Sequence, residues 1–260
     1  MQMISHNVRA LIKGIRNGRL LAIAQRYIDF ARADRAIVGK YGLVIRDGVF
    51  AGMRYSLFPP GHHVAAKILG IYEREISELL REVMPQQYDV IVNIGSAEGY
   101  YAVGLARHFD NAKVLAFDIQ EREQAFCARL AEVNGVGDRV EVRGLCDHAT
   151  LQSILVDKSL IVIDCEGCEY ELLDPQIVPA LKRSDMIVEI HDFGGSTRIM
   201  DAIQSRFSQT HHIWIAQSEP RDPAQIPALD AVRDERIRRA AVLERDAPQR
   251  WCYLRARMAS

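Results

Sequence analysis

Short apolar runs alternate with segments of helical periodicity through most of the chain. Seven runs rich in branched and aromatic residues predict strands, at residues 90–94, 114–118, 140–145, 160–164, 186–190, 212–216 and 250–254. Helical patterns occur between them at residues 102–106, 121–133, 149–156, 169–173 and 197–206. Because strands that alternate with helices form parallel sheets covered on both faces, the pattern predicts an α/β fold with a doubly wound, seven-stranded sheet.

The first 60 residues follow another pattern and predict an extension of a larger domain at residues 61–260. Apolar positions three and four apart predict one helix at 8–15 and another at 20–28, separated by Asn17-Gly18. The polar faces of both helices are basic, so the pair could bind a membrane surface or an acidic partner. Packing against the larger domain, or against a second subunit in a homo-oligomer, is the simpler interpretation.

Two further elements lead from this extension to the first strand of the sheet. Asp47-Gly48 is a dipeptide that type I′ turns prefer, so residues 41–55 are predicted to form a β-hairpin. A helical pattern then runs from His62 to Met84 and ends before Pro85.

The strongest functional signal lies in the stretch 88–106, where a buried strand, a small-residue loop and an apolar helix follow one another. Gly95 and Gly99 let the loop approach a ligand closely, but they stand four apart, unlike the G-x-G-x-x-G of a dinucleotide site. Asp118, 19 residues past Gly99 at the end of the second strand, can accept hydrogen bonds from both ribose hydroxyls. Because this loop does not demand a pyrophosphate, a nucleoside such as adenosine carrying a methionine suits it better.

Three segments in order resemble class I S-adenosylmethionine (SAM) methyltransferases, and among these the FkbM-like subgroup. Residues 93–101 look like the family's first motif, with Asn93 in place of the usual acid and Ala97 in place of the middle glycine. Residues 161–173 resemble an Ile-Asp-x-Glu-Gly-x-Glu block, and residues 187–192 resemble a strand that ends in Glu-Ile-His. The matches run from about residue 69 to residue 193. They imply a Rossmann-like fold, SAM as the cofactor, and methyl transfer to a hydroxyl oxygen of a small molecule or of a sugar or glycan.

The resemblance also implies a set of site residues. We expect cofactor contacts from the loop and from the strand ends beside it, at Asn93, Gly95, Ser96, Ala97, Gly99, Tyr100, Asp118, Ile119, Cys146, Asp147 and Asp164. Asp147 could accept a hydrogen bond from the adenine amino group, cap the helix that follows it, or do both. Tyr72 and Glu73 stand in the helix that often lines the pocket in this family. The simpler interpretation makes Tyr72 a core residue and Glu73 a solvated charge.

His191 is the candidate catalytic base. A neutral imidazole with a pKa near ~6.5 can take a proton from a hydroxyl group at physiological pH. His191 follows a strand end next to Asp164, the second candidate catalytic residue, where open α/β sheets place their ligands. Asp164, His191 and Asp192 could alternatively hold a divalent cation that acidifies the acceptor hydroxyl. We expect no obligatory metal.

The remaining cysteine and histidine patterns carry no predicted site. Cys165-x-x-Cys168 lacks the second ligand pair that structural zinc requires, so we interpret the two residues as incidental thiols. The pairs His62-His63 and His211-His212 also lack ligand partners at useful spacing.

Composition limits the class of protein. Five cysteines, an odd number with irregular spacing, fit a reducing compartment, and no apolar run approaches the ~20 residues of a membrane span. A net charge of −1 argues against a nucleic-acid binder, although residues 1–40 carry +6 from eight Lys or Arg and two Asp. These features predict a cytoplasmic globular protein with no integral membrane segment.

Two other functions compete with the methyltransferase interpretation. A nicotinamide-dependent oxidoreductase would share the fold, but the missing third loop glycine counts against it. A non-catalytic SAM-binding interaction module would bind the cofactor without turnover, and changing His191 would then have no effect.

Overall fold

A computed structural model of the chain describes residues 20–56, 58–59, 61–230, 232–244 and 248–257. The helix expected at 8–15 lies outside these residues. The described chain forms two compact units. The first contains the residues up to Tyr72 together with the segment from Pro220, and the second contains Glu73–Glu219 and the last strand. The expected division between 1–60 and 61–260 stays a prediction.

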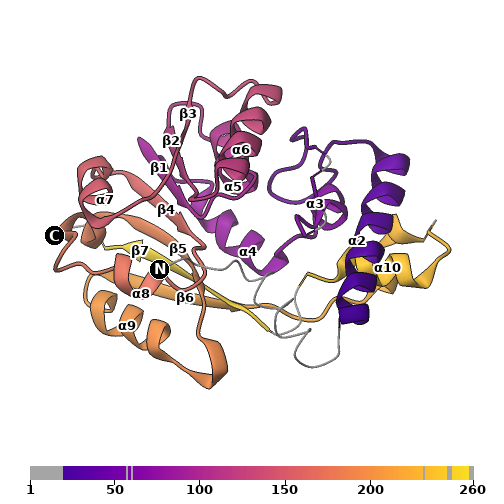
Figure 1. Cartoon of the computed structure of the whole chain (residues 1–260). Helices are drawn as coiled ribbons and strands as arrows, with labels where there is room; N and C mark the ends of the chain where they lie inside the picture. Colours follow the sequence, from indigo (N-terminus) through magenta and orange to yellow (C-terminus); the bar gives the residue numbers. More distant parts are fainter. Residues whose placement is uncertain (1–19, 57, 60, 231, 245–247, 258–260) are drawn as a thin grey trace. The chain divides into compact units, whose positions relative to one another are not determined.

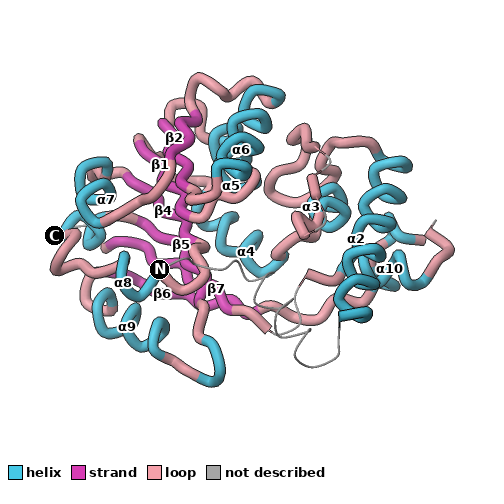
Figure 2. Tube along the Cα trace, in the orientation of Figure 1, coloured by secondary structure: helices cyan, strands magenta, loops and turns pink. Residues whose placement is uncertain are grey.

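The second unit is built on one seven-stranded sheet (Figures 1 and 2). The strand order is β3-β2-β1-β4-β5-β7-β6, and the first five of these strands run parallel. The strands are β1 Val90–Ile94, β2 Lys113–Phe117, β3 Val140–Arg143, β4 Ser159–Ile163, β5 Asp185–Ile190, β6 His211–Gln217 and β7 Arg250–Ala256. β7 runs antiparallel to both of its neighbours and inserts between β5 and β6. The expected Rossmann-like, doubly wound, seven-stranded α/β sheet is confirmed.

Helices cover both faces of this sheet because every parallel connection has to cross over it. They are α4 Arg74–Val83, α5 Tyr100–His108, α6 Glu121–Val133, α7 His148–Ile154, α8 Glu169–Leu172 and α9 Arg198–Phe207. A 3-10 turn at Pro179–Arg183 precedes β5, and another at Phe193–Gly195 follows it. Figure 1 shows α5 and α6 on one side of the strands and α7 to α9 on the other. Leu151 of α7, Leu172 of α8 and Ile203 of α9 share one buried cluster with strand residues such as Val92 and Ile161.

The chain reverses direction across the sheet between β1 and β4. β1 pairs with β2 on one side and with β4 on the other. The crossover from β1 to β2, which contains α5, and the crossover from β3 to β4, which contains α7, pass over opposite faces (Figure 1). Open α/β sheets bind their ligands outside the carboxyl ends of the strands at such a switch point. The loop after β1 and the turn after β4 both start there.

The first unit contains α2 Leu20–Tyr41, α3 Val64–Leu69, α10 Glu235–Val242 and two 3-10 turns at Pro223–Gln225 and Pro227–Leu229. Ion pairs Arg32–Asp234 and Arg236–Asp29 join α2 to the start of α10, at 3.2 Å and 2.8 Å. The predicted second helix is confirmed, and it is longer than its apolar stripe indicated.

Two local predictions in the linking region need correction. The arms of the expected hairpin pair through an antiparallel bridge between Val44 and Arg54, but their connection is longer than a two-residue turn at Asp47-Gly48. The single helix expected from His62 to Met84 is two helices, α3 and α4. A Cβ on Gly70 would lie 2.1 Å from the carbonyl oxygen of Asp47, and Gly70 has a φ of 73°. The chain therefore breaks the helix at Gly70, where the loop packs too closely for any side chain.

Candidate active site

Two glycines fix the loop after β1 against its neighbours. A Cβ on Gly95, whose φ is 75°, would lie 1.7 Å from the carbonyl oxygen of Asp164. A Cβ on Gly99, whose φ is 94°, would lie 2.7 Å from Sγ of Cys127 on α6. The first glycine thus lets the loop touch the end of β4, and the second lets α5 start close to α6. Both positions require glycine for conformation and for space.

Four backbone amides of this loop are used within the protein. The N–H groups of Gly95 and Ser96 both donate to the carbonyl oxygen of Phe117, at 2.8 Å and 2.9 Å. The N–H of Ala97 donates to Oδ2 of Asp118 at 2.9 Å, and the N–H of Gly99 donates to the Ser96 carbonyl oxygen at 2.8 Å. A pyrophosphate cradle needs such amides to point at the ligand. Here three of them tie the loop to the end of β2, and that of Gly99 closes a turn within the loop.

Asp118 is held by its own surroundings. Its Oδ1 accepts the N–H of Gln120 at 2.8 Å, while Oδ2 accepts Ala97. Burial raises the pKa of the Asp118 carboxyl above its usual value, and the two backbone hydrogen bonds oppose that shift. An ionised carboxylate has about four acceptor positions, so two remain for the hydroxyls of a ligand.

The other residues expected to contact the cofactor surround the same strand ends. Asn93 is buried within β1 and donates through Nδ2 to the carbonyl oxygen of Val162 on β4, at 3.2 Å. Its Oδ1 has no hydrogen-bond partner among the residues that the structure describes. Ser96 and Tyr100 are buried, whereas Ile119 is exposed next to Asp118.

The third strand end carries Cys146 and Asp147. Cys146 is buried, and burial raises the pKa of its thiol to about 12. Asp147 accepts the backbone N–H of Thr150 at 2.8 Å and so caps α7, and hydrogen bonds from Thr150 lower the pKa of its carboxyl. The capping role is confirmed, and the contact with adenine stays a prediction.

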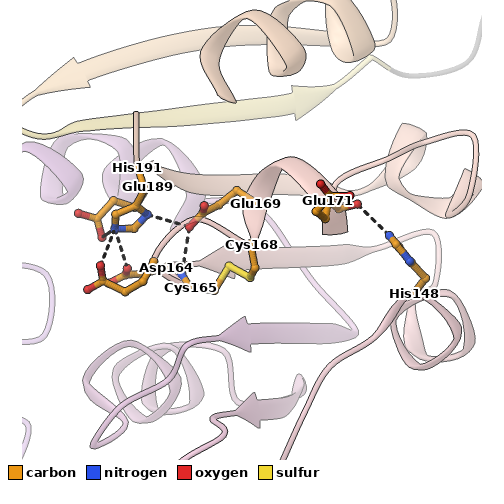
Figure 3. The surroundings of a disulfide bond; sticks show 9 residues. His148, Asp164, Cys165, Cys168, Glu169, Glu171, Glu189 and His191 are labelled. Carbon is orange, nitrogen blue, oxygen red and sulfur yellow. Dashed lines mark hydrogen bonds and ion pairs between the residues drawn. A yellow bond between two sulfur atoms is a disulfide. The ribbon is translucent and has the colours of Figure 1, made fainter. Parts of the chain in front are cut away.

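His191 lies at the centre of a group of carboxylates (Figure 3). Its Nδ1 lies 2.8 Å from Oε1 of Glu169, whose side chain is 0% exposed. Its Nε2 faces Oδ1 of Asp164 at 3.5 Å, Oε2 of Glu189 at 3.7 Å and Oε2 of Glu166 at 3.9 Å. The structure therefore brings together the two candidate catalytic residues, His191 and Asp164.

These carboxylates change the acidity of the imidazole. Burial by itself lowers the pKa of His191, because it penalises the charged ring. The hydrogen bond with Glu169 and the negative charges of Asp164, Glu169 and Glu166 act in the opposite direction and prevail. The pKa of His191 is consequently raised above its usual value.

Glu169 and Glu189 are site residues that the sequence analysis left without a role. Glu169 is the last residue of the Ile-Asp-x-Glu-Gly-x-Glu block, and Glu189 is a buried carboxylate inside an apolar strand. A charged residue in an otherwise apolar strand is a signal that could have identified Glu189, because such groups need a partner. The Glu169–His191 contact spans 22 residues and has no local signature.

A cation site is geometrically available, but with other residues than expected. One ligand atom each from Asp164, Glu189 and His191 lies within 4.8 Å of the other two. Asp192, which we had placed in this group, accepts the N–H groups of Ile199 and Met200 and pairs with Arg250 at 3.1 Å. Its carboxylate holds the start of α9, so the metal alternative, if it applies, would use Glu189 in place of Asp192.

Two further predictions need correction. Cys165 and Cys168 are joined by a disulfide rather than being incidental thiols, and the bond closes the turn between β4 and α8 (Figure 3). Glu73 is completely buried rather than a solvated charge, and its carboxylate accepts a hydrogen bond from the Tyr101 hydroxyl.

Comparison with known proteins yields structural neighbours only. No protein-family model matches the sequence, and no curated protein matches it. Precorrin-6y C5,15-methyltransferase from Geobacter metallireducens superposes with a TM-score of 0.48 and 12% identity, over 71% of this chain and 88% of that one. An O-methyltransferase from Bacillus cereus in complex with SAH superposes with a TM-score of 0.46 and 15% identity, over 87% of this chain and 90% of that one. For precorrin-8w decarboxylase from Methanobacterium thermoautotrophicum the TM-score is 0.45 and the identity 16%, over 68% of this chain and 89% of that one. At these values the neighbours do not identify the reaction of this chain.

None of the described helices combines the length and the apolar character that a membrane crossing would need.

Proposed function

We propose that this protein is a SAM-dependent methyltransferase that transfers a methyl group to a hydroxyl oxygen of a small molecule or of a sugar or glycan. The observation that carries the proposal is the hydrogen bonding of the loop after β1. Its amides at Gly95, Ser96 and Ala97 are satisfied by Phe117 and Asp118. This leaves a small, closely packed loop beside a carboxylate, which suits a nucleoside without phosphates better than a nicotinamide dinucleotide.

The residues at the switch point offer hydrogen-bond acceptors that match the donor groups of SAM. Asp118 would hold the ribose hydroxyls through its remaining acceptor positions. The buried Oδ1 of Asn93 offers a further acceptor at the end of β1. Ile119 and Cys146 would line the adenine, and Asp147 would stand at its edge. When bound, SAM supplies an electrophilic methyl group on a sulfonium.

Proton removal from the acceptor falls to His191. Glu169 is a buried carboxylate and accepts only, so in the neutral ring Nδ1 carries the hydrogen and Nε2 keeps its lone pair. Nε2 faces Asp164, which would stabilise the imidazolium after the hydroxyl proton has been taken. In this scheme Glu169 orients the base, and Asp164 stabilises the charge that develops on it. No resident metal is required, since the ring already provides the base.

A calorimetric titration tests the cofactor assignment. We expect SAM to bind the wild type, and Asp118→Ala to weaken binding ~10- to 100-fold, equivalent to ~1.5–3 kcal/mol for a charge-assisted hydrogen bond. Asp157→Ala is the matched control, because Asp157 is an exposed carboxylate of the same unit paired with Arg183. Unchanged affinity in Asp118→Ala would remove that residue from the ribose role. Binding of NADH without binding of SAM would overturn the proposed function.

A further inference from the structure

In the turn between β4 and α8, two of the site carboxylates flank a pair of cysteines. Cys165 directly follows Asp164, and Cys168 directly precedes Glu169. The disulfide joins the two cysteines at a Cα–Cα distance of 5.5 Å (Figure 3). Any change in this bond therefore acts on the chain next to Asp164 and Glu169, two of the four carboxylates that face His191.

One carboxylate oxygen of Glu169 links the backbone of the turn to the imidazole of His191. The N–H of Cys165 donates to Oε1 of Glu169 at 3.1 Å, and the same oxygen lies 2.8 Å from Nδ1 of His191. Within the turn, Glu166 has a φ of 57° and Gly167 a φ of 108°. The left-handed region costs a residue with a side chain ~1–2 kcal/mol, so Glu166 would favour another conformation if the turn were free to open.

Solvent access separates this pair from the other cysteines. Cys165 and Cys168 are each half-buried, whereas Cys127, Cys146 and Cys252 are buried. Burial raises the pKa of each of these three thiols to about 12, which suppresses the reactive thiolate. A redox partner in solution would therefore act on Cys165 and Cys168 first.

We propose that Cys165 and Cys168 form a reversible thiol–disulfide switch that sets the position of Glu169 and thereby of His191. In the oxidised state the closed turn holds Glu169 against the imidazole. On reduction, a thiolate of a dithiol protein attacks one sulfur and breaks the Cys165–Cys168 bond, giving a mixed disulfide. The donor's second thiol then releases it. Two electrons and two protons pass from the dithiol to the cysteine pair, and the donor becomes the disulfide. A disulfide-carrying oxidant runs the same exchange in reverse.

Reduction removes the constraint on the turn. Glu166 can then leave the left-handed region, and Glu169 loses the N–H of Cys165 as an anchor. His191 keeps its place on the strand end but loses its fixed orientation. The effect on turnover rests on the proposed function, whereas the effect on the imidazole does not. Reduction should lower the rate of methyl transfer about tenfold. Release of one residue from the left-handed region is worth ~1–2 kcal/mol, which corresponds to about a tenfold fall in the population of the closed turn.

Mass spectrometry and NMR on the full chain test the switch. After oxidation by oxidised glutathione, Cys165 and Cys168 should resist alkylation, and a phosphine reductant should expose both while Cys127, Cys146 and Cys252 stay unlabelled in the folded protein. The same reduction should shift the His191 imidazole resonances, assigned by their loss in His191→Gln. Cys165→Ser/Cys168→Ser is the matched control and should show the reduced-state resonances with no response to the phosphine.

Two results would overturn the switch. One is alkylation of Cys165 or Cys168 in the oxidised protein without reductant, and the other is reduction that leaves the His191 resonances unchanged. If the resonances shift but SAM does not bind, the switch stands and the proposed function fails. If SAM binds and the resonances do not shift, the switch fails and the proposed function is untouched.

Discussion

Replacing Gly95 by alanine should destabilise the fold far more than the same replacement at an unconstrained glycine. Gly95 has a φ of 75°, and its added Cβ would lie 1.7 Å from the carbonyl oxygen of Asp164. The left-handed backbone costs an L-residue ~1–2 kcal/mol. Because the obstacle is backbone rather than a flexible side chain, either the loop or the end of β4 has to move, which costs a further ~1–3 kcal/mol. The expected loss of unfolding free energy is therefore ~2–5 kcal/mol.

Gly135→Ala separates the two contributions. Gly135 has a φ of 68°, and nothing lies within 4 Å of its added Cβ. This control should lose only the ~1–2 kcal/mol of the backbone conformation. Urea unfolding followed by circular dichroism measures both variants, and SAM titration should show weaker binding in Gly95→Ala alone, since Asp164 is displaced. Equal losses of unfolding free energy in the two variants would refute the reasoning, because the close contact between Gly95 and the end of β4 would then add nothing to the cost.

Two further predictions concern the chemistry of the site. His191→Gln should lower the rate of methyl transfer ~10²–10⁴-fold with little change in SAM affinity. The wild-type rate should rise with pH through the raised pKa of His191 because the base must be neutral, and the variant should lose this rise in a pH-rate profile. The raised pKa also means that the charged ring stabilises the fold fully below its unfolded pKa of ~6.5, and that this stabilisation disappears as the pH rises through the folded value. Near-normal turnover in the variant would return His191 to a structural role. Exhaustive chelation should leave methyl transfer largely intact. Loss of activity that magnesium restores would instead make Asp164, Glu189 and His191 metal ligands.

The succession of strands and helices along the chain, and the position of the candidate site, followed from local sequence patterns. Apolar runs such as Val90–Ile94 form buried strands wherever a sheet is available, and the glycines that follow mark the point of close approach. These signals depend only on neighbouring residues. For that reason the sheet and the loop after β1 were predictable. The juxtaposition of His191 with Asp164 followed from their places at the carboxyl ends of two parallel strands, which meet at the same edge of a sheet.

Tertiary structure decided which buried groups meet. The sequence left Glu169 and Glu189 without roles, offered Asp192 as an alternative metal ligand and made Glu73 a solvated charge. In the fold, Glu169 reaches His191 across 22 residues, Asp192 caps α9, and Glu73 is buried against Tyr101. A buried carboxylate takes whichever donor the packing places within reach, because leaving it unpaired costs several kcal/mol, on the order of a whole domain's margin of stability. That choice involves residues far apart in the chain, so no local pattern records it.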